Sequence, residues 1–193
     1  MVPWAVARRE IAALALLLGV AISPALPAES GWAEPLQGGV ALPNLYRVSD
    51  VLLRGAQPDE HGFELLRRLG VRTVINVRPN RHEGEPCLRN GLRYVEIPMR
   101  AWSFDEQDVV RFLEIAGSAD HAPVFVHCRR GADRTGMLVA VYRVAIEGWS
   151  KEAALEEMTQ GPYGYNRMWK QLRRFVRDMD VERLRAAAGL DEQ

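Results

Sequence analysis

One stretch near the middle of the chain constrains the fold more than any other. Residues 124–127 are a short apolar run typical of a buried strand, and residues 128–134 (Cys-Arg-Arg-Gly-Ala-Asp-Arg) form a tight polar loop. An apolar helical pattern follows from Thr135 to Glu147 and ends at Gly148. A strand, a short loop and a helix in this order direct loop N–H groups and a helix N-terminus toward one point, where an anion can bind.

The loop begins with a cysteine and ends with an arginine. The thiolate is the nucleophilic form of cysteine, and a nearby cation and a helix N-terminus both favour it. Arg134 supplies that cation, and its planar guanidinium can hold two oxygens of one phosphate. Gly131 lets the backbone approach a ligand closely, and Thr135 places a hydroxyl where it can hydrogen-bond the Cys128 sulfur. These residue types predict nucleophilic chemistry on a bound phosphate.

The motif His-Cys-x-x-Gly-x-x-Arg-Thr-Gly at residues 127–136 resembles the phosphate loop of the cysteine-based protein tyrosine phosphatases. The resemblance implies that Cys128 is the nucleophile that forms a phosphocysteine and that Arg134 binds phosphate and stabilises the transition state. It also implies that Thr135 stabilises the thiolate and that His127 orders the loop from behind. The implied phosphate-binding residues are Arg129, Arg130, Gly131, Ala132, Asp133 and Arg134.

The resemblance covers most of residues 45–185 and is greatest to small exported bacterial tyrosine or dual-specificity phosphatases. It rests on Arg-x-x-Gln-Pro at 54–58, Val-Ile-Asn-x-Arg at 74–78, the phosphate loop, and a glycine- and tyrosine-rich loop at 161–165. It implies a phosphomonoesterase that needs no metal and no cofactor.

The rest of the chain alternates strand and helix patterns. We expect strands at 44–48, 52–54, 71–77, 92–97 and 124–127, and helices at 58–69, 103–119, 135–147, 151–159 and 167–188. The segment 78–91 is polar and turn-rich. This alternation predicts an α/β fold with a small, mainly parallel central sheet flanked by helices, in which the catalytic loop leaves the carboxyl end of a strand.

The N-terminus has the pattern of an export signal. Two arginines precede an apolar run at 11–22, and small residues follow, with Ala25 and Ala28 as candidate cleavage points. An uncleaved membrane anchor is the alternative, but only a run counted on through Ala28 reaches about the minimum length for a span, and Pro24 and Pro27 break it. The expected divisions are a signal peptide at 1–28, a linker at 29–43 and a phosphatase domain at 44–188. We therefore expect a periplasmic or secreted protein.

The departing alkoxide or phenolate needs a proton, and a carboxylic acid upstream of the cysteine is the usual donor in such phosphatases. Asp105 fits that position best, because it follows a strand end and opens a helix. Acidic residues are also favoured in a first helical turn by the helix dipole alone. Asp133, inside the loop, is the competing candidate, since myotubularin-like lipid phosphatases carry an Asp at that position. The sequence leaves the acid open.

The composition limits the classes of binding partner that we expect. The chain of 193 residues carries 25 basic and 25 acidic residues, so its net charge points neither to nucleic acid nor to a membrane surface. We expect a phosphorylated protein as substrate, phosphotyrosine first and phosphoserine or phosphothreonine after it. We also expect a monomer with no nucleic-acid partner and no stable membrane anchor after signal cleavage.

Other functions stay open at this point. Arg129, Arg130 and Asp133 keep a phosphoinositide or inositol-phosphate phosphatase as an alternative. A non-catalytic phosphate-binding module is a second alternative. The chain has two cysteines, Cys87 and Cys128, too few for a disulfide framework or a metal cluster. Cys87 could trap an oxidised Cys128 as a disulfide, a possibility that spacing alone does not decide.

Overall fold

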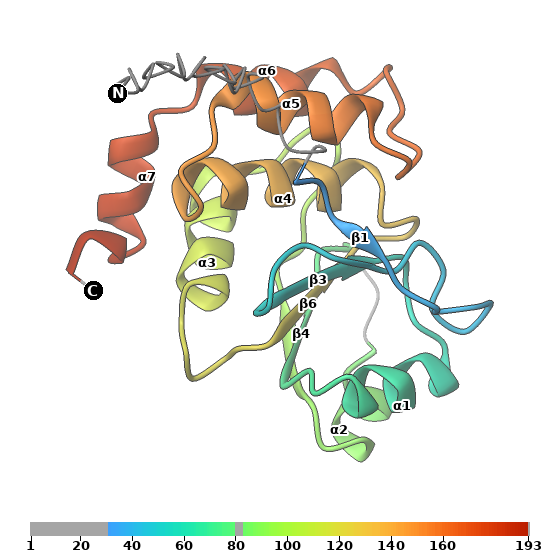
Figure 1. Cartoon of the computed structure of the whole chain (residues 1–193). Helices are drawn as coiled ribbons and strands as arrows, with labels where there is room; N and C mark the ends of the chain where they lie inside the picture. The colour runs from blue at the N-terminus through green and yellow to red at the C-terminus, as the bar shows by residue number, and fades with distance from the viewer. Residues whose placement is uncertain (1–30, 80–82, 193) are drawn as a thin grey trace, which may run out of the picture. The chain divides into compact units, whose positions relative to one another are not determined.

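The computed structural model describes residues 31–79 and 83–192 (Figure 1). The expected signal peptide at 1–28 lies outside the described residues. Within them, the strands are β1 (Glu34–Pro35), β2 (Tyr46–Arg47), β3 (Leu52–Gly55), β4 (Thr73–Asn76), β5 (Arg93–Glu96) and β6 (Val124–His127). The helices are α1 (Glu60–Arg68), α2 (Gly84–Arg89), α3 (Glu106–Ala116), α4 (Asp133–Ala145), α5 (Lys151–Gln160), α6 (Lys170–Asp178), α7 (Val181–Ala187) and the 3-10 helix η1 (Leu190–Glu192).

The strands form one sheet in the order β1-β2-β3-β6-β4-β5. Strands β3, β6, β4 and β5 pair in parallel, and β1 and β2 add an antiparallel edge. The prediction of a small, mainly parallel sheet is confirmed. Because β6 lies between β3 and β4, its carboxyl end reaches the ligand-binding edge of the sheet with a strand on either side.

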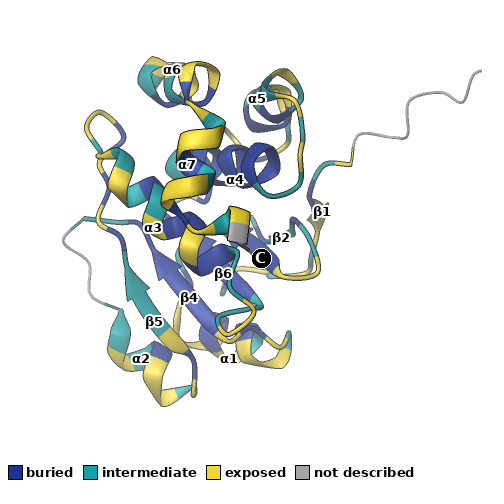
Figure 2. Cartoon of the chain, turned by 90° about the vertical axis from the view of Figure 1, so that its left-hand side faces the viewer, coloured by how far each residue is buried: buried dark blue, intermediate teal, exposed yellow. Residues whose placement is uncertain are grey.

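The sheet separates two apolar cores. Helices α1 and α2 cover one face, and α3 to α7 cover the other, with α4 against the sheet (Figures 1 and 2). Alternation along β6 explains the division: Val124 and Val126 enter the core around α4, whereas Phe125 enters the core that contains Phe63 and Leu66 of α1. The β6 strand is buried on both faces, so it reads as a continuous apolar run in the sequence.

Helix α4 is the centre of the larger core. Every residue of the helix except Arg134 is buried, and it contacts α3, α5, α6 and α7. Its N-terminus therefore has a fixed position beneath the loop that β6 delivers. The helix begins at Asp133, so Asp133 and Arg134 lie in its first turn rather than in the preceding loop.

Three elements differ from the sequence-based expectation. The polar segment 78–91 contains α2, whose helical pattern is hidden by its short length and by Gly84 and Pro86 in its first turn. The expected helix at 167–188 is two helices, because Met179 is extended (ψ 142°) and Asp180 caps α7 by accepting a hydrogen bond from the Arg183 N–H. Part of the expected linker pairs with β2 as strand β1.

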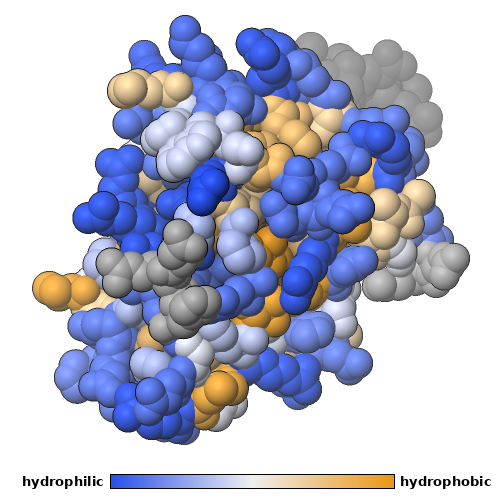
Figure 3. Space-filling model, turned by 180° about the vertical axis from the view of Figure 1, so that it is seen from behind, coloured by the Kyte–Doolittle hydropathy of each residue, from blue (hydrophilic) through white to orange (hydrophobic). Residues whose placement is uncertain are grey.

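The surface is largely hydrophilic on the face shown in Figure 3, where apolar side chains are gathered in the middle and upper part. Trp102 and Met168 are among the large apolar side chains that are exposed. No helix in the described ranges is both long enough and apolar enough to cross a bilayer.

Candidate active site

Cys128 lies at the point where β6 ends, 2% exposed, and the loop 128–132 carries the chain into α4. The loop turns sharply at Gly131, which has φ +67°. A Cβ at this position would lie 2.3 Å from the backbone of Gly55, so only glycine fits. The β3 end and the phosphate loop are thus in direct backbone contact.

Three consecutive loop carbonyls are held on the outside of the turn. The carbonyl of Arg129 accepts from the Gln57 N–H (3.4 Å) and that of Gly131 from Arg54 Nη2 (2.9 Å). The carbonyl of Arg130 accepts from Asn44 Nδ2 (2.8 Å). In a trans peptide the next N–H points opposite to the carbonyl, so the amides of residues 130–132 face the inner side of the loop. This arrangement is an anion cradle.

The same groups act on the thiol. Burial by itself raises the pKa of Cys128, but the Thr135 hydroxyl, the charge of Arg134 and the N–H groups of Thr135 and Arg130 outweigh it. The net effect lowers the pKa of the Cys128 thiol below its usual value. The site therefore favours the thiolate, as a nucleophilic cysteine requires.

Arg134 is anchored by backbone on the far side of the pocket. Its Nη1 donates to the carbonyls of Met99 (2.9 Å) and Val77 (3.3 Å), which follow β5 and β4. The side chain therefore spans the carboxyl ends of neighbouring strands, at a position fixed before any ligand arrives. Arg134 and Cys128 line the same pocket, of about 720 Å³.

The pocket is strongly cationic. Five arginines line it: Arg78, Arg100, Arg129, Arg130 and Arg134. The other lining residues are Pro79, Ala101, Trp102, Cys128, Asp133 and Trp169. Arg129 and Arg130 are exposed, and Arg130 Nη2 also pairs with Asp133 Oδ2 (3.1 Å). A phosphate group entering this pocket meets positive charge on several sides.

His127 lies behind the loop with no exposed surface. Burial, only partly offset by a hydrogen bond to the Cys128 carbonyl, and the charges of Arg78 and Arg134 lower the pKa of His127 to about 3. A neutral ring donates from Nδ1 to the Cys128 carbonyl (3.3 Å), and its Nε2 lies 3.7 Å from Glu83 Oε2. His127 is thus placed to orient the peptide that carries the nucleophile.

The two candidate acids occupy different places. Asp133 lines the pocket, where its Oδ1 accepts from the Asn166 N–H (2.7 Å) and its Oδ2 from Arg130. Asp105 is exposed and is the N-cap of α3, in a capping box with Asp108. The residues that line the pocket do not include Asp105. The sequence favours Asp105 as the acid, whereas the pocket lining favours Asp133, so the identity of the acid stays a prediction.

Arg54 and Cys87 are not among the residues that line the pocket. Arg54 contacts the Gly131 carbonyl and the Tyr163 ring (3.8 Å). Cys87 is buried in the core on the α1–α2 side, whereas Cys128 belongs to the core around α4, and both are free thiols. Within the described residues, no group of three or more His, Cys, Asp or Glu side chains is arranged to hold a metal ion.

Asn44 is a site residue that sequence reasoning missed. It has φ 56°, the left-handed region that Asn tolerates better than most residues, and its amide donates to the carbonyls of Arg130 and Tyr163 (3.0 Å). It thereby joins the phosphate loop to the 161–165 loop. The only signal in the sequence is its place at the start of the first expected strand.

Comparison with known proteins agrees with this geometry. The family model of a "DSP-PTPase phosphatase fused to NAD+ Kinase" matches residues 44–171. The dual specificity protein phosphatase TpbA of Pseudomonas aeruginosa (strain UCBPP-PA14) is 35% identical over 174 residues, which cover 89% of this chain and 78% of that protein. The inositol diphosphatase DSP5 of Arabidopsis thaliana is 27% identical over 152 residues, which cover 74% of this chain and 72% of that protein.

Solved structures agree as well. A Cys-to-Ser variant of P. aeruginosa TpbA in complex with pTyr matches with a TM-score of 0.73 and 32% identity, covering 84% of this chain and 99% of that chain. The core catalytic domain of the PP-IP phosphatase SIW14 from S. cerevisiae shares the fold, with a TM-score of 0.69 at 21% identity over 80% of this chain and 96% of that chain. The chain therefore belongs to the tyrosine and dual-specificity phosphatase (DSP-PTPase) family.

Proposed function

We propose that the protein hydrolyses phosphate monoesters on proteins, phosphotyrosine first, through a phosphocysteine intermediate on Cys128. The observation that carries this proposal is the cradle: a buried thiol with a lowered pKa, ringed by inward-facing amides and the anchored Arg134. The similarity to TpbA, which has been crystallised with pTyr, supports phosphotyrosine as the substrate.

The chemistry follows from the positions of the groups. The Cys128 sulfur attacks phosphorus while the bond to the leaving oxygen breaks, and Arg134 and the loop amides bind the three equatorial oxygens. A carboxylic acid, Asp133 or Asp105, gives its proton to the leaving oxygen. The resulting carboxylate then takes a proton from the water that attacks phosphorus, which breaks the S–P bond and regenerates the thiolate.

The first test is turnover of p-nitrophenyl phosphate and a phosphotyrosine peptide by wild type and Cys128→Ser, with EDTA and a reductant present. We expect hydrolysis by wild type in EDTA and its loss in the variant. Residual activity of the Ser variant within tenfold of wild type would contradict a cysteine mechanism. A wild type that binds phosphate but hydrolyses nothing would instead indicate the phosphate-binding module.

A second candidate function is hydrolysis of a polyphosphorylated small molecule, such as an inositol phosphate or phosphoinositide. It is favoured by the five arginines that line the pocket, more than one phosphate needs, and by the similarity to the inositol diphosphatase DSP5. Comparing kcat/KM for inositol polyphosphates, phosphoinositides and phosphotyrosine peptides on one enzyme preparation decides between the two.

We also propose that the protein is exported, on the strength of the signal pattern in residues 1–28. Expression of the full chain in a bacterium, followed by fractionation and intact mass, tests this. Cleavage after Ala25 or Ala28 and recovery from the periplasm are expected. Recovery of the full-length mass in the cytoplasm would contradict it.

A further inference from the structure

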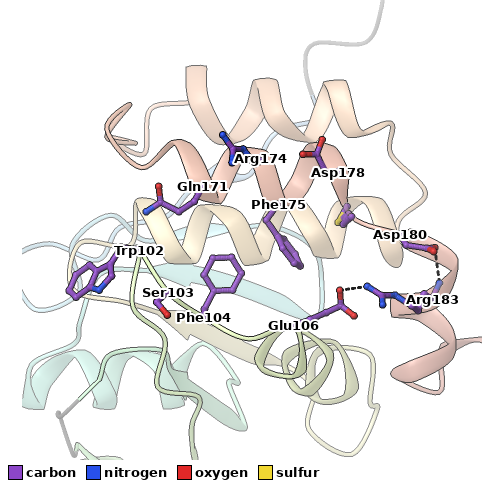
Figure 4. A pocket seen from close by; sticks show the side chains of 11 residues that line it. Trp102, Ser103, Phe104, Glu106, Gln171, Arg174, Phe175, Asp178, Asp180 and Arg183 are labelled. Atoms are coloured by element: carbon purple, nitrogen blue, oxygen red, sulfur yellow. Dashed lines mark hydrogen bonds and ion pairs between the residues drawn. The ribbon is translucent and has the colours of Figure 1, made fainter.

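A second pocket lies beside the catalytic pocket. It has a volume of about 570 Å³ and runs between the segment leading into α3, one side of α6 and the start of α7 (Figure 4). We call it the α6 groove. Its middle is aromatic: the Phe104 and Phe175 rings meet edge to face, with centroids 5.2 Å apart. Both rings are only partly buried, so the groove presents apolar surface to a ligand.

The groove and the catalytic pocket share a wall. Trp102 lines both, and it is 64% exposed. It stacks on Trp169, another residue of the catalytic pocket, with ring centroids 6.1 Å apart. Gln171 Nε2 donates to the Ala101 carbonyl (2.6 Å) and ties α6 to this wall. A peptide bound in the catalytic pocket therefore reaches the α6 groove by passing over Trp102.

Most charged side chains of the groove are paired with an opposite charge, and Arg174 differs from them. Its far end is closed by the ion pair between Glu106 and Arg183. Asp178 is bound through both oxygens by Arg177 (2.7 and 2.8 Å). Arg174 is exposed on the rim, where its charge acts on Asp178, but it makes neither a hydrogen bond nor an ion pair with any described residue. The groove thus offers one available cation beside an apolar floor.

We propose that the α6 groove binds the polypeptide next to the phosphorylated residue of the substrate. It takes an aromatic or large aliphatic side chain over Phe104 and Phe175, and an acidic side chain at Arg174. This inference rests on the proposed protein phosphatase function and deepens it. A small phosphate ester fills the catalytic pocket alone, whereas a phosphopeptide reaches both pockets.

The test uses the full chain and a set of phosphotyrosine peptides whose other residues are Gly and Ser. In each peptide one position beside the phosphotyrosine is changed to Leu or Phe, and in a second set one further position is changed to Glu. At the favoured position, we expect kcat/KM at least tenfold above the background peptide. Phe175→Ser and Arg174→Glu should reduce this preference to less than threefold. Both should leave turnover of p-nitrophenyl phosphate within twofold of wild type.

Arg173→Glu is the matched control, since it reverses the same charge on the same helix outside the groove. It should keep the full peptide preference. Arg174→Glu is a surface change, so the test stands even where Phe175→Ser fails to fold. Equal turnover of all peptides by an active wild type, or a preference that survives both groove variants, would overturn the groove inference alone. Turnover of p-nitrophenyl phosphate with none of any phosphopeptide would overturn the protein phosphatase function and the groove inference together.

Discussion

Arg54 Nη2 donates a hydrogen bond of 2.9 Å to the Gly131 carbonyl from a side chain with no exposed surface. Burial lowers the pKa of Arg54, opposed by the nearby Tyr163, Glu157 and Cys128. Its Nε and Nη1 have no hydrogen-bond partner among the described residues. A buried cation with too few hydrogen bonds destabilises the folded protein. We therefore infer that the positive charge of Arg54 and its hydrogen bond to the loop contribute to the function of the active site.

We therefore predict that Arg54→Met raises the pKa of Cys128 and lowers kcat/KM for p-nitrophenyl phosphate by about tenfold or more, since a hydrogen bond from a charged group contributes about 1.5–3 kcal/mol. The loss of one cation destabilises the thiolate, and the Gly131 carbonyl loses its donor. The rate of Cys128 alkylation as a function of pH measures the pKa. Arg68→Met, an exposed arginine at the end of α1, is the control. An unshifted alkylation curve in Arg54→Met would refute the role.

The hydroxyl of Thr135 gives a prediction for pH dependence. The thiolate is the active form, and the lowered pKa of Cys128 keeps activity present at acidic pH until the pH falls through that value. Thr135→Val removes the hydroxyl that helps to lower the pKa of Cys128, so that pKa rises and the acid limb of kcat/KM moves to higher pH. Activity at pH 5 should fall more than activity at pH 7.5. Thr159→Val, on α5, should leave the profile in place.

Much of this site follows from the sequence because the motif is local. Cys128, Gly131, Arg134 and Thr135 lie on one strand–loop–helix unit, so their spacing predicts both their chemistry and the fold around them. The supports of the loop are not local. Asn44 and Arg54 reach it from residues 86 and 77 positions away, and only the pairing of β3 with β6 brings Arg54 there. The motif Arg-x-x-Gln-Pro singles out Arg54, but nothing in the sequence indicates which residue it contacts.

The boundaries of the helices are also only partly predictable from the sequence. The apolar pattern of 167–188 continues across Met179, so the break between α6 and α7 depends on local backbone and on the Asp180 cap. The α6 groove exists because of that break, since Met179, Asp180 and Arg183 form its end. Sequence periodicity predicts the buried side of each helix but not the space between them.

For the proton donor, we predict that Asp133→Asn slows hydrolysis of a phosphotyrosine peptide by about 100-fold, the scale of general acid catalysis. Asp133 lines the pocket, whereas Asp105 caps α3 at an exposed position. The effect on p-nitrophenyl phosphate should be much smaller, because nitrophenolate hardly needs a proton. Asp105→Asn is the matched comparison and should change either rate by less than threefold. A larger peptide effect at Asp105 would show that the segment before α3 moves over the pocket when substrate binds.

A buried ion pair fixes the α4–α5 packing and gives a stability prediction. Glu157, 1% exposed, accepts from Arg143 Nε (2.9 Å) and Nη2 (3.1 Å), from the Tyr163 hydroxyl and from the Ala33 N–H. Glu157→Ala leaves the Arg143 guanidinium buried without the carboxylate that neutralises its charge and accepts two of its hydrogen bonds. This change should lower the free energy of unfolding by about 3–5 kcal/mol. Denaturant unfolding measures it. Glu156→Ala, an exposed neighbour, should cost less than about 0.5 kcal/mol, and equal losses in the two variants would contradict the role of the pair.

The last prediction concerns oxidation. Burial, followed by the charge of Glu83, raises the pKa of Cys87 to about 12, and its Sγ faces the Arg93 carbonyl at 3.7 Å. Cys87 is therefore a thiol at physiological pH and cannot readily attack an oxidised Cys128. Of the two cysteines, peroxide should modify Cys128 alone, and peptide mapping without reductant should find no Cys87–Cys128 disulfide. Cys87→Ala should be inactivated by peroxide, and reactivated by reductant, at the wild-type rates. A disulfide-linked peptide pair in wild type, or faster irreversible loss in Cys87→Ala, would show that the core around α2 opens to bring the two thiols together.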